Sequence, residues 1–440
     1  MIEKDYSLST EAKACLVSMI SPKLKEHSTE DETKRSIDEL RELMRTLHIE
    51  VGSEFVQNKK SVDPATMLGS GKLQEIAEEA KEEGANILVF DFELTASQIR
   101  NIKKITDLSV VDRCHVILEI FAKHAQTREA KIQIEIARLQ YVLPRLSGFW
   151  THLSRQKGGV GVRGGEGEQQ IELDRRIIRE RIEFYKRELK EVVKSQEQQK
   201  KRRQNQAITA ALVGYTNAGK SSLMNRLCKV DVLEEDKLFA TLDSTFRTLT
   251  PDTRPPMILI DTVGFLSNLP NTLIDGFRTT LESAMEAELL IIVCDISDPH
   301  YEKHLQVTFD ILNELKLEKK EKLIVFNKKD LLENDLKKKL AIRTNPDSFL
   351  VSTFDKEDMK RLREHIINYF LAKQAHYDLF VPYEAGSVHS SIEGKTNIIS
   401  RNNLEKGIFY RVRVPEFIFQ NLGIQKYILS PDDPLLKELQ

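Results

Sequence analysis

Apolar runs and segments of helical spacing alternate along the chain between residues 47 and 125. Runs rich in Val, Ile, Leu and Phe are typical of strands, and apolar residues three and four apart are typical of helices. This alternation predicts an α/β subdomain, which we place at residues 1–125. We expect strands at 47–56, 85–90 and 109–112, and helices at 73–82, 96–104 and 113–123.

The next part of the chain has apolar residues in a repeating 4, 3, 4, 3 spacing. Two segments show it, Ile132, Ile136, Leu139, Leu143, Leu146 and then Ile178, Ile182, Tyr185, Leu189, Val192. Such spacing predicts two helices with a heptad face. Between them, residues 147–169 hold seven glycines. We therefore expect an antiparallel helical hairpin at residues 126–203 with a long glycine-rich loop at its tip.

From residue 207 onward, apolar runs again look like buried strands, and several of them end in a polar motif. This arrangement predicts a phosphate-loop domain at 207–372, with a mixed, mostly parallel sheet, helices on both faces and a closing helix at 356–370. The tail, 373–440, contains strand-like runs at 377–382 and 407–415. It predicts a small α+β domain.

The clearest chemical signal follows the run 207–213 directly, and reads Gly214-Tyr-Thr-Asn-Ala-Gly219-Lys220-Ser221. The glycines let backbone N–H groups turn toward a polyphosphate, Lys220 can reach its terminal phosphates, and the Ser221 hydroxyl can ligate Mg²⁺. A surface turn that matches the pattern by chance is the alternative. The strand before it and the helix-like segment after it favour a triphosphate site.

Two later motifs narrow the nucleotide to one that carries guanine. Asp261-Thr-Val-Gly264 follows a buried run, so it brings a carboxylate to the metal and a glycine N–H to the γ-phosphate. Asn327-Lys-Lys-Asp330 ends another run, and its Asp can accept from the ring N–H and amino group of guanine, a pair of donors that adenine lacks. Residues 352–354 follow a further strand-like run and are expected to support the base. Each polar residue alone has an ordinary turn or cap as its alternative.

Phe265 occupies the position where many small GTPases carry a glutamine that orients the attacking water. A phenyl ring neither donates nor accepts such a hydrogen bond. The residue also has a simple structural explanation, which is packing against a neighbouring helix. In both cases we expect slow intrinsic hydrolysis, and we hypothesise that a large partner stimulates it.

Charge is distributed unevenly along the chain. The net charge is −2, yet residues 128–203 contain 19 Lys and Arg against 11 Asp and Glu, an excess of +8 that leaves −10 for the rest. A basic segment can bind a polyanion, although a solvated helix face is the commoner explanation. The glycine-rich loop at 147–169 carries residues suited to phosphate contact and base stacking. The alternative is that this loop is only a mobile linker. The candidate RNA contacts are Trp150, His152, Arg155, Lys157 and Arg163.

Several classes of protein are not indicated. A length of 440 residues predicts two to four domains. Four scattered cysteines suggest neither a disulfide framework nor a zinc site, and we expect buried thiols. No signal peptide and no long apolar span occur, so we expect a cytoplasmic protein without stable membrane association. Gly69-Ser-Gly-Lys72 superficially matches a second phosphate loop, but no buried strand precedes it, and a helix cap at Ser70 or Gly71 explains it better.

The chain resembles the HflX family of translation-factor-related GTPases. The resemblance rests on Phe239-Ala-Thr-Leu-Asp243, Asp261-Thr-Val-Gly-Phe265 and Asn327-Lys-Lys-Asp330, with Ser70-Gly-Lys-Leu73 and Ser154-Arg-Gln-Lys-Gly-Gly159 outside the GTPase domain. It covers residues from about 35 to 372 well and the two ends poorly. It implies that Thr241 closes on Mg²⁺ and the γ-phosphate, and Thr245 remains a competitor for that role.

These motifs and the resemblance together give the expected sites. Lys220, Thr241 and Gly264 are the catalytic candidates, and Ser221 and Thr241 the Mg²⁺ ligands. GTP or GDP is expected to contact Gly214, Tyr215, Thr216, Asn217, Ala218, Gly219, Lys220, Ser221, Ser222, Phe239, Ala240, Thr241, Leu242, Asp243, Asp261, Thr262, Val263, Gly264, Asn327, Lys328, Lys329, Asp330, Ser352, Thr353 and Phe354.

The resemblance also implies a function. It points to a GTP-hydrolysing switch that binds the ribosome, chiefly RNA of the large (50S-type) subunit, and that splits or rescues stalled ribosomes under stress. We expect a monomer, with ATP as a further ligand that no sequence feature locates. A regulatory GTPase acting on a protein partner or membrane surface, without an RNA role, is the alternative. An RNA-modifying enzyme would need a further catalytic cluster, which the sequence does not show.

Overall fold

A computed structural model describes residues 12–24, 27–146, 165–204, 207–228, 239, 245–249, 253–266, 285–332, 341, 343–430 and 433–434. The chain divides into two compact units. The first holds the residues up to Val192 and, further along, Phe239; the second holds the remaining described residues. Each unit is described by itself.

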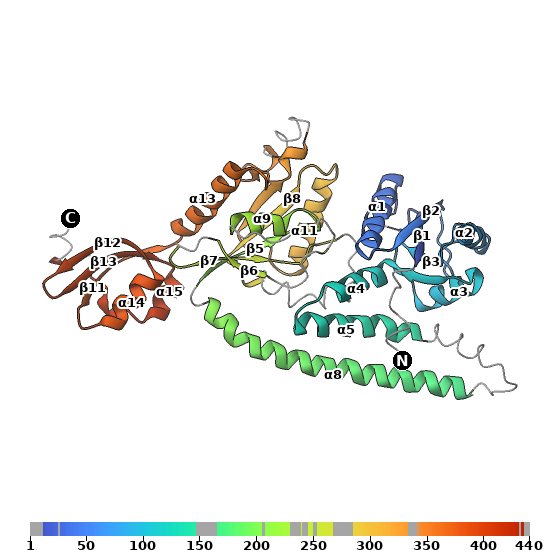
Figure 1. Ribbon diagram of the computed structural model, residues 1–440, viewed down its shortest axis with the longest axis horizontal. Helices are drawn as coiled ribbons and strands as arrows, with labels where there is room; N and C mark the ends of the chain where they lie inside the picture. The colour runs from blue at the N-terminus through green and yellow to red at the C-terminus, as the bar shows by residue number, and fades with distance from the viewer. Residues whose placement is uncertain are drawn as a thin grey trace. The chain divides into compact units, whose positions relative to one another are not determined.

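The first unit contains a parallel sheet with strand order β2-β1-β3-β4. Its strands are β1 (Lys13–Ile20), β2 (Glu50–Asn58), β3 (Ile87–Phe90) and β4 (Ser109–Asp112). Helices α1 (Glu30–Thr46), α2 (Ser70–Glu82), α3 (Ala96–Thr106) and α4 (Arg113–His124) connect and follow them (Figure 1). The α/β prediction is confirmed, but β1 and α1 were not predicted. The cap of α2 also differs, because Gly69 is the N-cap and contributes no side chain.

A pair of long helices completes the first unit. Helix α5 (Arg128–Val142) is followed by a short 3-10 helix (Leu143–Arg145), and α8 spans Gly165–Gln204. Figure 1 shows α8 running alongside α5, and an ion pair between Arg128 and Glu188 links them. The heptad faces are buried at Ile132, Ile136, Leu139, Ile178 and Ile182. The loop expected at 147–169 is too long, because residues 165–169 are helical.

The second unit is built on a six-stranded sheet with order β10-β9-β8-β5-β7-β6, in which β6 alone among these strands is antiparallel. A core of buried residues from α9, α13 and the central strands fills one face, and α11 packs against β8 (Figure 1). The bounds are β5 (Ile208–Val213), α9 (Lys220–Leu227), β6 (Thr245–Thr248), β7 (Met257–Asp261), β8 (Leu289–Asp295), α11 (Tyr301–Glu314), β9 (Lys322–Asn327), β10 (Phe349–Leu350) and α13 (Lys356–Ala372). The phosphate-loop fold is confirmed.

The tail of the chain forms a small antiparallel sheet with order β11-β13-β12. Its core is apolar and includes Tyr410, which is fully buried. The elements are β11 (Ala375–Pro382), α14 (Gly386–Lys395), β12 (Asn397–Leu404), β13 (Gly407–Val414) and α15 (Glu416–Leu422). The predicted α+β character of the tail is therefore present, and the two predicted strands are β11 and β13.

Candidate nucleotide site

The loop between β5 and α9 requires its two glycines. Gly214 has φ +149°, and a Cβ built there would lie 2.2 Å from the carbonyl oxygen of Val293 in β8. Gly219 has φ +87°, and its Cβ would lie 2.3 Å from Nδ2 of Asn327. Both the conformation and the space exclude other residues. The loop is thereby drawn tightly over the carboxyl ends of β5, β8 and β9.

Lys220 opens α9 and is buried, with 6% of its surface exposed. Its Nζ donates to the carbonyl oxygens of Gly214 at 3.1 Å and Tyr215 at 2.7 Å. Burial lowers the pKa of this ammonium to about 8, and the nearby carboxylate of Asp261 opposes that shift. A buried cation surrounded by neutral carbonyls is stabilised by added negative charge. Lys220 is therefore placed to bind phosphate.

Ser221 and Asp261 join the first two motifs. The Ser221 hydroxyl donates to Oδ2 of Asp261 at 2.7 Å, and Asp261 is 1% exposed at the carboxyl end of β7. A hydroxyl oxygen beside a buried carboxylate is the hard oxygen environment that Mg²⁺ prefers. The residues present therefore fit the metal that the phosphate loop implies.

The segment after Asp261 is bonded to the phosphate loop through the backbone. Phe265 N–H donates to Gly214 O at 3.0 Å, and Thr216 N–H donates to Phe265 O at 2.7 Å. A Cβ on Gly264 would lie 2.8 Å from Cα of Thr216 and 2.9 Å from Nζ of Lys220. Gly264 thus lies against the phosphate-loop lysine. The Phe265 side chain is 2% exposed, which supports its packing role.

Asn327 connects the base motif to the phosphate loop. It is 1% exposed, and its Nδ2 donates to the carbonyl of Ala218 at 3.0 Å. Its Oδ1 is buried and has no partner among the described residues, so it can accept from a ligand donor. Lys328 has φ +61°, and its Nζ pairs with Asp295 at 2.8 Å. Asp330 is exposed in the short 3-10 helix that follows.

The candidate base-supporting loop is held by a residue that sequence reasoning missed. Asp358 accepts from the backbone N–H of Ser352 at 2.8 Å and forms an ion pair with Lys329. It therefore links residues 352–354 to the base motif. Ser352 and Thr353 are buried, whereas 74% of Phe354 is exposed. An acidic residue in the first turn of the predicted helix at 356 was the available signal.

A second missed residue is His304 of α11. Its ring stacks on Tyr215 with centroids 3.9 Å apart and planes 9° apart. Tyr215 is 7% exposed, so this stack fixes one side of the phosphate loop. No feature near His304 in the sequence predicted the contact, because it joins segments that are far apart along the chain.

Several expected site residues lie outside the described residues. These are Ala240, Thr241, Leu242 and Asp243, together with the candidate RNA contacts Trp150, His152, Arg155, Lys157 and Arg163. Thr245, the competitor of Thr241, begins β6 and pairs in register with Asp261. Phe239 is described and belongs to the first unit, where its ring meets Phe121 of α4 edge-on at 4.5 Å between centroids.

Three further features concern the cysteines, possible metal ligands and the length of the helices. All four cysteines are buried and free. Within the described ranges, no group of three or more His, Cys, Asp and Glu side chains could hold a metal ion. In that same part of the chain, no helix is both long and apolar enough to cross a bilayer.

Three family models match successive parts of the chain. Residues 34–122 match the family model for the "GTP-binding GTPase N-terminal" region, 124–203 that for the "GTP-binding GTPase Middle Region", and 209–328 that for a "50S ribosome-binding GTPase". A crystal structure of a GTP-binding protein from Sulfolobus solfataricus in complex with GDP is 26% identical, covers 81% of this chain and 98% of its own, and has a TM-score of 0.40.

Curated relatives extend the match over most of the chain. The GTPase HflX of Alkalihalophilus pseudofirmus is 42% identical over 358 residues, which are 81% of this chain and 82% of that relative. The GTPase HflX of Flavobacterium psychrophilum is 47% identical over 305 residues, 69% of this chain and 73% of the relative. The GTPase domain and these relatives indicate that the chain hydrolyses GTP and is of a ribosome-associated class. The chain belongs to the HflX family of GTPases.

Proposed function

We propose that this chain is a GTP-driven switch that docks on the large ribosomal subunit and separates or rescues stalled ribosomes under stress. The observation that carries the switch is the direct bonding between its two phosphate-facing segments. Ser221 donates to Asp261, and Thr216 N–H donates to Phe265 O, each at 2.7 Å. A change at the γ-phosphate is therefore transmitted to the backbone after Asp261. The protein acts as a monomer in the cytoplasm.

The chain's own groups bind and orient the nucleotide. Lys220 would hold the terminal phosphates, because its ammonium is buried beside the loop and is stabilised by their charge. Ser221 and Thr241 would hold Mg²⁺, with Asp261 bonded to Ser221. When bound, Mg²⁺ supplies positive charge that stabilises the transferring phosphoryl group. The unpartnered Oδ1 of Asn327 and the exposed carboxylate of Asp330 would accept hydrogen bonds from the guanine base.

Hydrolysis depends on a partner in this proposal. Phe265 is buried and its side chain has no group that could orient water. Single-turnover hydrolysis should therefore be slow for the protein alone and much faster with purified 50S subunits. Equal rates with and without the subunits would overturn the partner requirement.

RNA contact is assigned to the hairpin. The excess of +8 over residues 128–203 and the match to the Middle Region support it. Co-sedimentation with ribosomes at graded salt, with a GTP analogue or GDP, tests the proposal. We expect more pelleting with the analogue, and loss of pelleting when residues 148–168 are deleted. Equal pelleting in both nucleotide states, or after the deletion, would favour a regulatory GTPase without an RNA role.

A charge-matched pair of variants separates specific contact from general attraction. Arg155→Ala with Lys157→Ala removes two cations from the loop. Arg176→Ala with Arg179→Ala removes two exposed cations from α8. We expect the loop pair to weaken ribosome association more than the helix pair. A larger loss of ribosome association in the helix pair would assign the RNA contact to α8 instead of the loop.

A further inference from the structure

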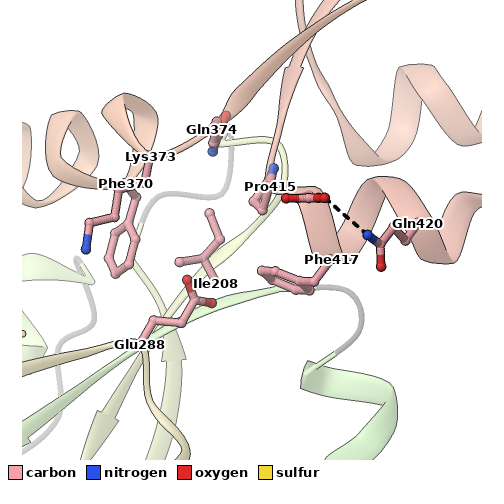
Figure 2. A pocket seen from close by; sticks show the side chains of 9 residues that line it. Ile208, Glu288, Phe370, Lys373, Gln374, Pro415, Phe417 and Gln420 are labelled. Carbon is pink, nitrogen blue, oxygen red and sulfur yellow. Dashed lines mark hydrogen bonds between the residues drawn. The ribbon is translucent and has the colours of Figure 1, made fainter. Parts of the chain in front are cut away.

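A pocket lies within the second unit where the GTPase sheet meets the tail domain (Figure 2). Its volume is about 500 Å³. Ile208 at the start of β5 and Glu288, just before β8, form one side, and the end of α13 and the start of α15 form the other. The phosphate loop follows the carboxyl end of β5, whereas Ile208 begins that strand. The pocket therefore lies at the amino ends of the strands, and the nucleotide site lies at their carboxyl ends.

The lining mixes polar and apolar side chains, and two of the apolar ones are aromatic. Ile208, Phe370 and Pro415 are buried, and Phe417 is half-buried. Figure 2 shows the rings of Phe370 and Phe417 on either side of Ile208 and Glu288. A volume in this range, at a junction of two domains and lined by aromatic and aliphatic groups, is typical of small-molecule sites. The two aromatic rings, Phe370 and Phe417, favour a flat ligand between them.

One polar group in this lining has no partner. Gln374 joins α13 to β11 and is 7% exposed, yet neither Oε1 nor Nε2 of its side chain has a hydrogen-bond partner in the described part of the chain. A buried carboxamide without partners costs about 1–3 kcal/mol, and a ligand that satisfies it recovers that free energy. The group presents a donor beside an acceptor. A nucleobase edge with an amino group beside a ring nitrogen is the complementary pattern.

The charged residues around the opening restrict the ligand further. Glu288 and Glu416 are exposed carboxylates, and Gln420 donates to Glu416 at 3.3 Å. The one cation among the lining residues, Lys373, is already bonded to Tyr369 Oη at 2.6 Å and paired with Glu321 at 3.4 Å. Carboxylates at the opening repel phosphate and attract amino groups. The opening therefore favours a base without phosphates.

We propose that this pocket binds an uncharged nucleobase or nucleoside. The base lies between Phe370 and Phe417, and its donor–acceptor edge pairs with Gln374. Adenine fits best, because a glutamine carboxamide can bond its amino group and N7 together. The site is separate from the guanine nucleotide site, so both are occupied at once.

Binding to the full chain saturated with GDP tests the proposal, because GDP fills the other site. Ligand-observed NMR with adenosine, cytidine, uridine and AMP is the measurement. We expect saturable binding of adenosine, and weaker binding of AMP because of its phosphate. A short single-stranded oligoadenylate tests whether the ligand is a free nucleoside or a base within RNA. It should also bind more weakly than adenosine.

Gln374→Leu is the decisive variant, since it keeps the bulk and removes the carboxamide. Adenosine affinity should fall about tenfold or more, the equivalent of about 1.4 kcal/mol. The melting temperature should not fall, because the variant removes an unpartnered buried group. Gln306→Leu, an exposed glutamine on α11 outside the pocket, is the matched control and should bind normally.

Three outcomes would overturn the proposal. They are no saturable binding by any nucleoside, unchanged affinity in Gln374→Leu, and AMP or the oligonucleotide binding as tightly as adenosine. None of these outcomes depends on ribosome association, so the ribosomal proposal stands or falls separately.

Discussion

Two aspartates each end a strand, one in the parallel sheet of the first unit and one in the mixed sheet of the second, yet only one belongs to a candidate site. Asp112 ends β4 in the first unit, and Asp261 ends β7 in the second. Both are buried, with exposures of 0% and 1%. Their positions at the carboxyl end of a strand are where α/β proteins place ligands. The difference between them lies in what surrounds each carboxylate.

Asp112 is surrounded by donors from its own unit. It accepts from the backbone N–H groups of Leu94 and His115, each at 3.0 Å, and from Tyr141 Oη at 2.9 Å. Arg145 lies 3.5 Å away. Burial raises the pKa of this carboxyl, and these donors oppose the rise. Asp112 therefore caps α4 and fastens it to α5.

Asp261 instead adjoins a loop built around glycines. Its Oδ2 accepts from Ser221, and Gly264 lies in close contact with the phosphate loop. Glycines let backbone approach backbone and leave room for a ligand. Glycine-rich loops therefore leave space beside the carboxylate of Asp261, whereas side chains of the first unit fill that space beside Asp112.

The largest expected effect comes from filling the glycine loop. Gly264→Ala places a Cβ 2.8 Å from Thr216 Cα and 2.9 Å from Lys220 Nζ, so the backbone must move. We expect ribosome-stimulated GTP hydrolysis to fall by about 10²–10³-fold, the range found when a transition-state contact is lost. Single-turnover assays measure it, with circular dichroism as the folding control. Activity within twofold, or about 0.4 kcal/mol, of the unchanged protein would contradict the proposed role of Gly264.

Asp112→Ala tests the other side of the comparison. It leaves the buried donors of Leu94, His115 and Tyr141 without this acceptor and removes the carboxylate beside the Arg145 guanidinium. The free energy of unfolding of the first unit should fall by about 3 kcal/mol or more. Urea denaturation measures this, while GDP affinity should be unchanged. A loss of GDP affinity at full stability would place Asp112 in the nucleotide site.

The sequence predicted best the parts whose determinants are local. The stretch Ser109-Val-Val-Asp112 was predicted as a strand and is β4 with those bounds. The motifs at Gly214, Asp261 and Asn327 are brought together because the strands before them, β5, β7 and β9, lie in one sheet. The run Lys13–Ile20 was missed although β1 is central and Ser18 alone interrupts its apolar stretch. The glycines at 165 and 167 suggested loop rather than helix.

Contacts between distant segments could not be read from local patterns. The bond from Asn327 to Ala218 spans 109 residues, and the stack of His304 on Tyr215 also depends on how the sheet orders its strands. The burial of Gln374, which follows the end of α13, also has no signal in the sequence near it.

A smaller effect than those of the two substitutions is expected for pH, which should change GDP affinity through the ammonium of Lys220. Its pKa is about 8 in the folded protein, below the ordinary value of 10.5, because burial disfavours the charge. Without nucleotide, stability is therefore lower below pH 8 and rises as pH increases from about 8 to 10.5. Bound phosphates favour the protonated amine, so GDP affinity should fall as pH rises through 8. Fluorescent-GDP titrations measure it, and Lys220→Arg, which stays charged, should flatten the profile. The same slope in that variant would assign the titration to another group.

The smallest effects should come from glycines of the first unit, where no loop approaches closely. A Cβ on Gly71 or Gly84 meets nothing within 4 Å, but Gly84 has φ +79° and Gly71, in the first turn of α2, has no positive φ. Gly71→Ala should raise the free energy of unfolding by about 0.5 kcal/mol, because alanine favours the helix. Gly84→Ala should lower it by about 1 kcal/mol, because alanine resists that conformation. Urea denaturation of both variants isolates the effect of backbone conformation, because there is room for a Cβ at each position. Equal changes in the free energy of unfolding of the two variants would mean that backbone conformation does not distinguish these glycines. The larger effect expected at Gly264 would then be explained by steric contact alone.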